Sequence, residues 1–149
     1  MRKHTLTGFP DAAIHLMRAL EQNRRQIGAD QGLTPTEMKT LFRIAEAGSI
    51  TPKQLAESLS VTNGAITGTS TRLVDAGLLQ RVAHPNDRRS LYLELTEAGH
   101  RAMVEIHADF NEMVGDATAG ITAEEIAVTI ETMRRVTDAI RARLQADGH

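Results

Sequence analysis

The 149-residue sequence contains no cysteine, and its apolar residues never gather into one long run. Without cysteine the chain can have no disulfides, no thiolate metal ligands and no thiol that senses peroxide. No apolar run approaches the ~18 residues that a membrane span needs. The basic residues Arg2 and Lys3 precede no hydrophobic stretch of the kind that a signal peptide has. We therefore expect a cytoplasmic protein that does not bind a membrane.

The patterns of common catalytic sites are also missing. The sequence has no glycine-rich phosphate loop, no His-Glu-x-x-His and no Gly-x-Ser-x-Gly. Its serine, histidine and aspartate residues are scattered and too common to indicate a nucleophile with its base. We therefore expect neither an enzyme nor a cofactor.

The sequence has no strong surplus of either charge, because its net charge is only −2. The charges are nevertheless segregated: residues 1–91 carry twelve Lys/Arg against eight Asp/Glu, whereas residues 92–131 carry one against nine. The weakly acidic total argues against indiscriminate binding of polyanions. A basic amino-terminal half is compatible with specific DNA binding, which should then weaken steeply as salt rises.

What is present is a series of helical patterns. Hydrophobic residues make up 41% and charged residues 24% of the chain, which is typical of one globular domain. An amphipathic helix is predicted for residues 11–27, and glycines within 28–32 should end it. A long helix is predicted from a cap at Thr96 to Val114, where residues 115–120 should interrupt it.

Two helix starts between these segments follow the same pattern. Thr34 and Thr51 are each followed by proline and, three positions on, by Glu37 or Gln54. This pairing is a capping box with proline at the first helical position, so it predicts two helices. A third helix begins near Thr62 after a three- to four-residue turn, which makes a helix-turn-helix.

The third helix has an outer face almost without apolar side chains. When Ile66 and Leu73 face the core, the opposite face carries small and hydrogen-bonding residues. These are Gly64, Gly68, Thr71 and Asp75, flanked by Asn63, Thr67 and Arg72. Helical glycines cost about 1 kcal/mol each relative to alanine, so two on one side favour close approach of another backbone. That backbone could belong to another helix of the protein or to DNA.

A β-hairpin is predicted directly after this helix, and it favours DNA. Residues 91–95 alternate leucine with polar residues, the period of a half-buried strand. The Pro-Asn-Asp sequence at 85–87 favours a turn, which we expect to span 85–90. The tip then carries two adjacent arginines, Arg88 and Arg89. The sequence therefore predicts a winged helix-turn-helix.

The carboxyl-terminal helix, which Thr122 can cap together with Glu125, carries an apolar seam. The seam positions are separated by alternating steps of four and three residues, as in a heptad. They are Ile126, Ile130, Met133, Thr137, Ile140 and Leu144. The seam could lie against the long helix of the same chain or against a second chain. A winged helix-turn-helix does not require the additional first and last helices. Their presence favours self-association, in which the seam packs against a second chain and the first helix lies beside it.

In this order, the elements resemble the MarR family of bacterial transcriptional regulators over nearly the whole chain. Three stretches carry the resemblance: Gly64-Ala65-Ile66-Thr67 with Arg72-Leu73, then Ala-Gly-Leu-Leu-Gln-Arg at 76–81, and Asp87-Arg88-Arg89 followed by Leu-Thr-Glu-Ala-Gly at 95–99. The resemblance implies a mainly α fold with a small β-hairpin wing, in which the N- and C-terminal helices form a dimerisation region. The expected segments of this single domain are dimerisation helices at 10–32 and 115–149, a winged helix-turn-helix at 33–95 and a connecting helix at 96–114.

The resemblance also implies a function. Members of the family are homodimers that bind pseudo-palindromic double-stranded DNA, usually near their own promoter, and typically release it on binding a small molecule. We expect this chain to act in the same way, as a repressor.

The recognition helix should supply the contacts in the major groove, where each base pair shows a distinct donor and acceptor pattern. Asn63 suits adenine, the hydroxyl and methyl groups of Thr67 and Thr71 can both be used, and Arg72 can reach a phosphate or a guanine. Relatives often have a bulky or basic residue where this chain has Gly68, so base contacts from that position are lost here. The full expected set is Thr62, Asn63, Gly64, Thr67, Gly68, Thr71 and Arg72.

Two other places should contact the DNA. Lys53 and Gln54, at the positive end of the preceding helix, can hold phosphates. In the wing, the resemblance points to Arg89 as the arginine that enters the minor groove, with Asp87 orienting it and Arg88 as a second contact. Narrow minor grooves attract such arginines through their negative potential.

The resemblance places an effector between the first, second and long helices. It suggests His15, Arg18, Arg43 and His107 as partners for a small phenolic or other aromatic acid.

Two alternatives remain open from the residues. One is a metal-responsive regulator of the same fold, because His100 and His107 share the long helix near Glu105. Zinc usually takes histidines at i, i+3 or i+4 with further ligands, and this spacing is wider. The other is an adaptor that kept the fold but lost DNA binding, which predicts a recognition helix free of arginine and a neutral wing.

Overall fold

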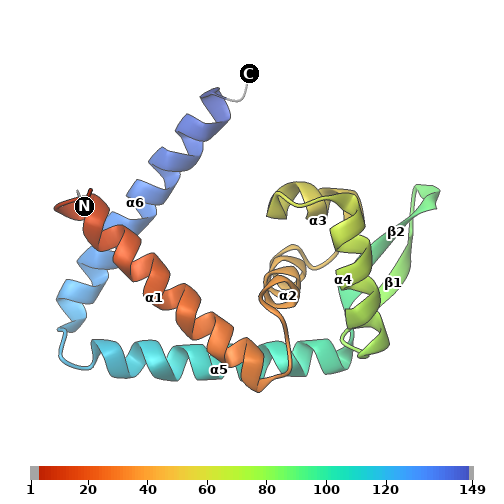
Figure 1. Cartoon of the computed structure of the whole chain (residues 1–149), viewed down its shortest axis with the longest axis horizontal. Helices are drawn as coiled ribbons and strands as arrows, with labels where there is room; N and C mark the ends of the chain where they lie inside the picture. The colour runs from red at the N-terminus through yellow and green to blue at the C-terminus, as the bar shows by residue number, and fades with distance from the viewer. Residues whose placement is uncertain (1–3, 148–149) are drawn as a thin grey trace. The chain divides into compact units, whose positions relative to one another are not determined.

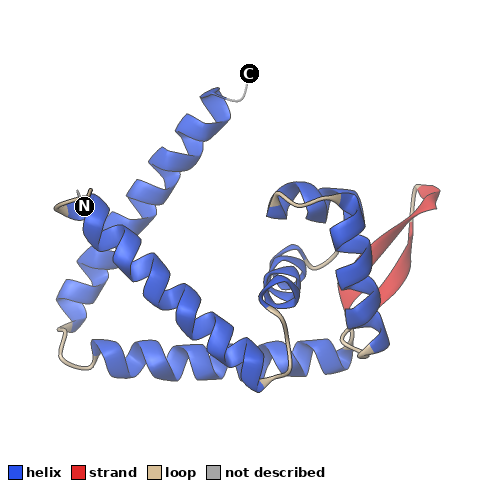
Figure 2. Cartoon of the chain, in the orientation of Figure 1, coloured by secondary structure: helices blue, strands red, loops and turns tan. Residues whose placement is uncertain are grey.

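The computed structural model describes residues 4–147, apart from the side chain of Arg88. Within that range the chain forms six helices and one antiparallel hairpin, so the predicted fold class is confirmed (Figures 1 and 2). The elements are α1 (Phe9–Asp30), α2 (Pro35–Ala47), α3 (Pro52–Leu59), α4 (Asn63–Asp75), β1 (Leu79–His84), β2 (Asp87–Leu95), α5 (Glu97–Thr118) and α6 (Ala123–Asp147). They divide into two compact units, residues 1–111 and 112–149.

The predicted capping boxes are confirmed. Thr34 Oγ1 accepts from the backbone N–H of Glu37 at 3.2 Å, and the backbone N–H of Thr34 donates to Glu37 Oε2 at 2.9 Å. Thr51 and Gln54 make the same pair of bonds at the start of α3, at 3.3 and 3.1 Å. These caps satisfy backbone N–H groups that have no partner inside their own helix.

The core of the first unit lies where α2 contacts α1, α3, α4 and β2. Its fully buried apolar side chains are Leu41, Ile44, Leu55, Ile66, Leu73, Leu79, Leu93 and Ile106. The backbones of Ile50 and Leu93 exchange two hydrogen bonds of 3.2 and 2.8 Å, which pin the base of the hairpin to the segment before α3. The scaffold therefore fixes both α4 and the root of the hairpin.

Two predicted helix ends are wrong. Helix α1 continues through Gly28 to Asp30, and α5 continues through Gly115 to Thr118. Gly28 is buried, and a Cβ there would lie 2.7 Å from Met38 Cγ, so this glycine serves close packing against α2 rather than termination. Helix α1 instead ends before Gly32, whose φ of +71° is the left-handed conformation typical of a helix end.

The turn of the wing is shorter than expected. Strand β2 begins at Asp87, so the expected turn of residues 85–90 is reduced to Pro85 and Asn86. A register shift between Ala83 and His84 accommodates it. Leu93 and Leu95 are buried as predicted, whereas Leu91 is 43% exposed because the strands extend beyond the core.

The second unit consists of the end of α5 and of α6. Helix α6 has no buried residue within the described part of the chain. On its seam, Ile130, Met133, Ile140 and Leu144 are 43%, 44%, 56% and 67% exposed. None of the helices of residues 4–147 combines the length and the apolar character that a membrane crossing requires. The division into dimerisation, winged-helix and connecting segments stays a prediction.

Candidate nucleic-acid interface

The outward face of α4 is formed by small polar residues. Thr62 caps the helix, because its Oγ1 accepts from the backbone N–H of Ala65 at 3.2 Å. Ile66 is 0% and Leu73 1% exposed, so the opposite side faces solvent. There Asn63, Gly64, Thr67 and Thr71 are exposed and Gly68 is half-buried. Nothing lies within 4 Å of a Cβ built on Gly64, so no other helix of the described chain packs on this glycine.

A basic side chain of the hairpin, Arg81, also lies beside this face, and the sequence patterns did not indicate it. Arg81 of β1 donates from Nη2 to Thr71 Oγ1 at 3.1 Å, so the hydroxyl of Thr71 already has a protein partner. Leu79 is buried, and alternate residues of a strand share one face. That alternation could have placed Arg81 on the same side as Leu79, toward α4, which contacts β1.

Arg72 also has a protein partner, and its expected contact with a phosphate or a guanine stays a prediction. Its Nε donates to Glu37 Oε1 at 2.9 Å, across α4 and α2. The Arg72 side chain is 59% exposed, whereas that of Glu37 is 10% exposed. One edge of the guanidinium is therefore committed to the scaffold.

Lys53 and Gln54 are exposed in the first turn of α3, as expected. Gln54 Oε1 serves the capping box, where it accepts from the backbone N–H and the hydroxyl of Thr51 at 3.1 and 3.0 Å. The amide nitrogen of Gln54 has no hydrogen-bond partner in the part of the chain that the structure describes. It can therefore act as a donor to a phosphate while the oxygen keeps the cap.

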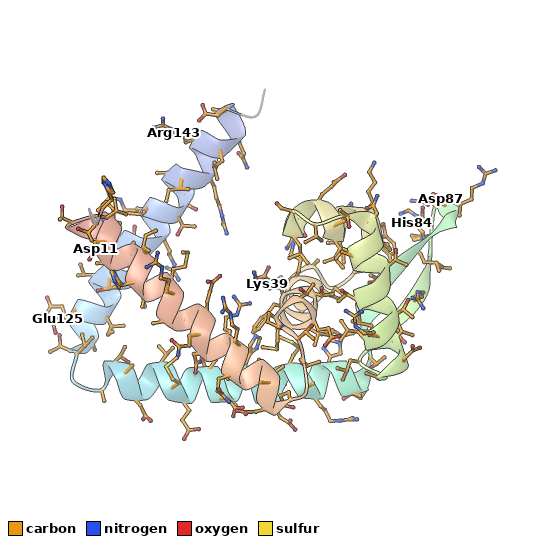
Figure 3. The ribbon with its side chains drawn as sticks, viewed as in Figure 1. Asp11, Lys39, His84, Asp87, Glu125 and Arg143 are labelled. Atoms are coloured by element: carbon orange, nitrogen blue, oxygen red, sulfur yellow. The ribbon has the colours of Figure 1, made fainter. Side chains whose placement is uncertain are left out.

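The wing is held by Asp87, which Figure 3 shows near its tip with His84. Asp87 Oδ1 accepts from the backbone N–H of Arg89 at 2.9 Å, and Oδ2 from Ser90 Oγ at 2.6 Å. The hydrogen bond from Ser90 and that from the Arg89 backbone lower the pKa of the Asp87 carboxyl. Asp87 thus orders the backbone that carries Arg89, and its expected role in orienting Arg89 toward DNA stays a prediction.

The rest of the wing tip is built around His84. Its ring stacks on Tyr92 with centroids 4.5 Å apart, and its Nδ1 accepts from the backbone N–H of Asn86 at 3.1 Å. Arg89 is exposed. The side chain of Arg88 lies outside the described residues, so its role stays a prediction.

The expected effector residues have separate surroundings. His15 lies 2.9 Å from the carbonyl oxygen of Asp11, and Arg43 pairs with Glu46 at 3.4 Å. Arg18 is exposed on α1. The His107 ring contacts Phe42 with centroids 5.4 Å apart.

A cavity lies elsewhere, between α1 and α2, with a volume of about 290 Å³. None of His15, Arg18, Arg43 and His107 lines it. The lining residues are Glu21, Arg24, Arg25, Pro35, Met38 and Lys39. The lining therefore contains three basic residues and one acidic residue. This surplus of positive charge favours binding of a small anion.

The structure does not favour a metal site. Within residues 4–147, no group of three or more His, Cys, Asp or Glu side chains lies close enough to hold a metal ion. His107 faces the ring of Phe42, and His100 is exposed. The metal-responsive alternative is therefore not supported. The exposed arginine in the wing and the arginines at α4 also disfavour the adaptor.

Comparison with known proteins identifies the family. The sequence model of the MarR family matches residues 33–91. The multiple antibiotic resistance protein MarR of Salmonella typhimurium is 32% identical over 105 residues, which are 70% of this chain and 73% of that protein. The chain belongs to the MarR family. It is thus a transcriptional regulator, and the predicted resemblance is confirmed.

Solved structures of MarR proteins share the fold. The wild-type apo MarR of E. coli superposes with a TM-score of 0.75 at 25% identity, covering 89% of this chain and 98% of that one. A mutant of the same E. coli protein, crystallised with operator DNA, gives a TM-score of 0.63 at 27% identity over 86% and 94% of the two chains. The residue-level contacts expected for this MarR-family chain stay predictions.

Proposed function

We propose that this MarR-family regulator is a homodimeric repressor that reads a pseudo-palindromic operator with α4 and the wing. The observation that carries the proposal is the bare outer face of α4, exposed on a helix whose inner face is fully buried. Small polar residues let the helix backbone approach base edges in the major groove. The MarR structure with operator DNA supports the same use of the fold.

Dimerisation is supported by the seam of α6. Side chains such as Met133 and Ile140 are 44% and 56% exposed in the single chain, and they recur at heptad spacing. A two-fold dimer presents two copies of α4, which read half-sites about one helical turn (~34 Å) apart. A pseudo-palindromic operator follows from that symmetry.

We further propose that a small aromatic acid releases the DNA by binding in the cavity between α1 and α2. Arg24, Arg25 and Lys39 can neutralise its carboxylate, while Pro35 and Met38 offer apolar contact. This assignment replaces the four residues expected from the resemblance. Binding there reaches the first turn of α2, from which Glu37 contacts α4.

The test is selection of preferred sites from random duplex DNA, followed by titration of the selected operator at several salt concentrations. We expect a palindromic consensus and a steep loss of affinity with salt. Benzoate and hydroxybenzoates should then release the DNA, whereas cyclohexanecarboxylate serves as a non-aromatic control. Arg25→Gln should blunt the release and Arg18→Gln should not. A protein that ignores every duplex at modest ionic strength would contradict the proposal.

The wing gives a direct prediction. Arg89→Ala should weaken operator binding well over tenfold, because an arginine in a narrow minor groove supplies a contact that no neighbour replaces. The dimer should be unaffected, since Arg89 is exposed in the wing. A gel-shift titration measures the affinity and light scattering the mass, with Arg101→Ala in α5 as a matched loss of charge. Unchanged affinity would remove the wing from the interface.

A further inference from the structure

The interface between α2 and α4 combines apolar core side chains with buried polar ones. All buried polar or charged residues found among the described ones belong to α2 or α4: Glu37, Thr40, Thr69 and Ser70. The hydroxyl groups of Thr40 and Ser70 have no hydrogen-bond partner within residues 4–147. Neither hydroxyl therefore links the two helices, whereas Glu37 of α2 bonds directly to Arg72 of α4.

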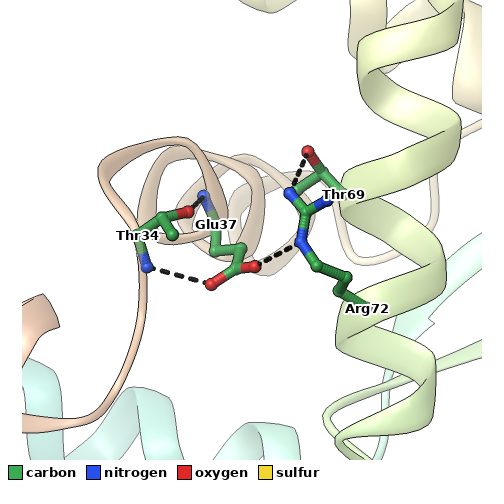
Figure 4. Close-up of polar contacts among 4 residues, drawn as sticks. All are labelled: Thr34, Glu37, Thr69 and Arg72. Carbon is green, nitrogen blue, oxygen red and sulfur yellow. Dashed lines mark hydrogen bonds and ion pairs between the residues drawn. The ribbon is translucent and has the colours of Figure 1, made fainter.

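Glu37 uses its two carboxylate oxygens in different ways (Figure 4). Oε2 accepts from the backbone N–H of Thr34, and Oε1 accepts from Arg72 Nε, each at 2.9 Å. Burial alone would raise the pKa of Glu37, but the Thr34 backbone and the Arg72 guanidinium bring it below its ordinary value. The carboxylate is thus charged and held from both sides.

This ion pair is unlike the others found in the described residues. The other four each join side chains three or four positions apart in one helix. Glu37 and Arg72 are 35 positions apart and join α2 to α4. The pair therefore constrains tertiary structure rather than one helical turn.

The free edge of the Arg72 guanidinium points toward the outer face of α4. Nη2 lies 3.4 Å from Thr69 Oγ1, whereas Nη1 has no hydrogen-bond partner in the described part of the chain. Nη1 stands 3.7 Å from the position that a Cβ on Gly68 would take. Because Gly68 has no side chain, nothing from that position covers Nη1. Gly68 therefore leaves this donor open.

We propose that Glu37 is a positioning residue for DNA binding, which holds the Arg72 guanidinium so that Nη1 meets a DNA phosphate over Gly68. The inference rests on the proposed function and adds the role of the Glu37 carboxylate, which holds Arg72 in place for its contact with DNA. Arginine has a flexible side chain, and fixing it before DNA arrives reduces the entropy lost on binding. One carboxylate oxygen occupies only one of the five N–H donors, so donors remain for the phosphate.

Glu37→Gln is the variant that separates this role from helix capping. Gln54 holds the equivalent position in α3 and completes its capping box, so glutamine at 37 can keep the cap. With its oxygen bonded to Thr34, the glutamine would turn an NH₂ group toward Arg72. The group facing Arg72 is then a hydrogen-bond donor instead of an acceptor. It cannot accept from Nε, so the Arg72 guanidinium loses this contact.

The experiment is a double-mutant cycle on operator affinity with wild type, Glu37→Gln, Arg72→Ala and the double variant. We expect Glu37→Gln to weaken binding about fivefold, and Arg72→Ala at least as much. Arg72→Ala should lower the slope of log affinity against log salt by about one, the value for one phosphate. In the Arg72→Ala background, Glu37→Gln should have no further effect. Thermal unfolding checks that each variant is folded.

Three results would overturn the inference. An equal loss from Glu37→Gln in both backgrounds would show that Glu37 only supports the fold. Tighter binding would show that Glu37 keeps Arg72 away from DNA. Unchanged affinity in a wild type that binds its operator would refute this inference and leave the proposed function standing. If the wild type binds no duplex, both fall.

Glu46→Gln is the matched control. Glu46 lies on the same helix, is exposed, and pairs only with Arg43 of that helix among the residues described, at 3.4 Å. Its replacement removes the same charge from α2 without touching α4. Operator affinity should stay within about twofold of wild type.

Discussion

Gly99→Ala should destabilise the protein by about 3 kcal/mol and lower its melting temperature by about 10 °C. A Cβ on Gly99 would overlap the carbonyl oxygen of Leu78. That oxygen cannot easily retreat, because it accepts from the backbone N–H of Thr96 at 3.1 Å. The Thr96 hydroxyl in turn caps α5 at Gly99 and donates to the Gly77 carbonyl at 2.6 Å. The first turn of α5 and the start of the wing must therefore move apart.

Gly115→Ala on the same helix is the control with the opposite sign. Within residues 4–147, nothing outside the neighbouring backbone of α5 lies within 4 Å of a Cβ at Gly115, so alanine should add about 1 kcal/mol of helix stability. Circular dichroism melts of the two variants measure both effects. A Gly99→Ala protein that melts like the wild type would show that the contact with Leu78 yields at little cost.

The local part of this fold could be predicted from sequence. Thr34 with Glu37 and Thr51 with Gln54 set two helix starts through bonds that span three residues. Such bonds depend on neighbours in the chain, so their pattern is visible before the fold is known. The buried face of α4 followed from periodicity for the same reason.

Features that depend on distant contacts could not be predicted. Gly28 resembled a helix breaker, and only the position of Met38 shows that its missing side chain makes room for α2. The pairing of Arg72 with Glu37 joins residues 35 positions apart, so no spacing rule reveals it. Strand alternation could have placed Arg81 on the side of β1 that faces α4, but its hydrogen bond to Thr71 depends on how β1 packs on α4. At the interface, sequence patterns indicated the donors, and tertiary packing decided their partners.

The apolar seam of α6, which we propose to form a dimer, is the second place where a large effect is expected. Met133→Glu should abolish self-association and weaken operator binding at least a hundredfold, because the two half-sites would no longer be bound by linked recognition helices. Met133 is 44% exposed in the single chain, so glutamate there buries no charge in the isolated fold. In a helical seam packed against a second copy, the same carboxylate would be desolvated without a partner. Sedimentation equilibrium measures the mass, and a gel shift measures the affinity.

Ala142→Glu provides the control that makes the effect specific to the seam. Ala142 is exposed and lies nine residues after Met133, which at 100° per residue is the opposite side of α6. It adds the same charge to the same helix, so general electrostatic repulsion from DNA should be alike in the two variants. We expect Ala142→Glu to stay dimeric with nearly wild-type affinity. If Met133→Glu remains a dimer while Ala142→Glu dissociates, the interface lies on the other face of α6 and the seam has a different role.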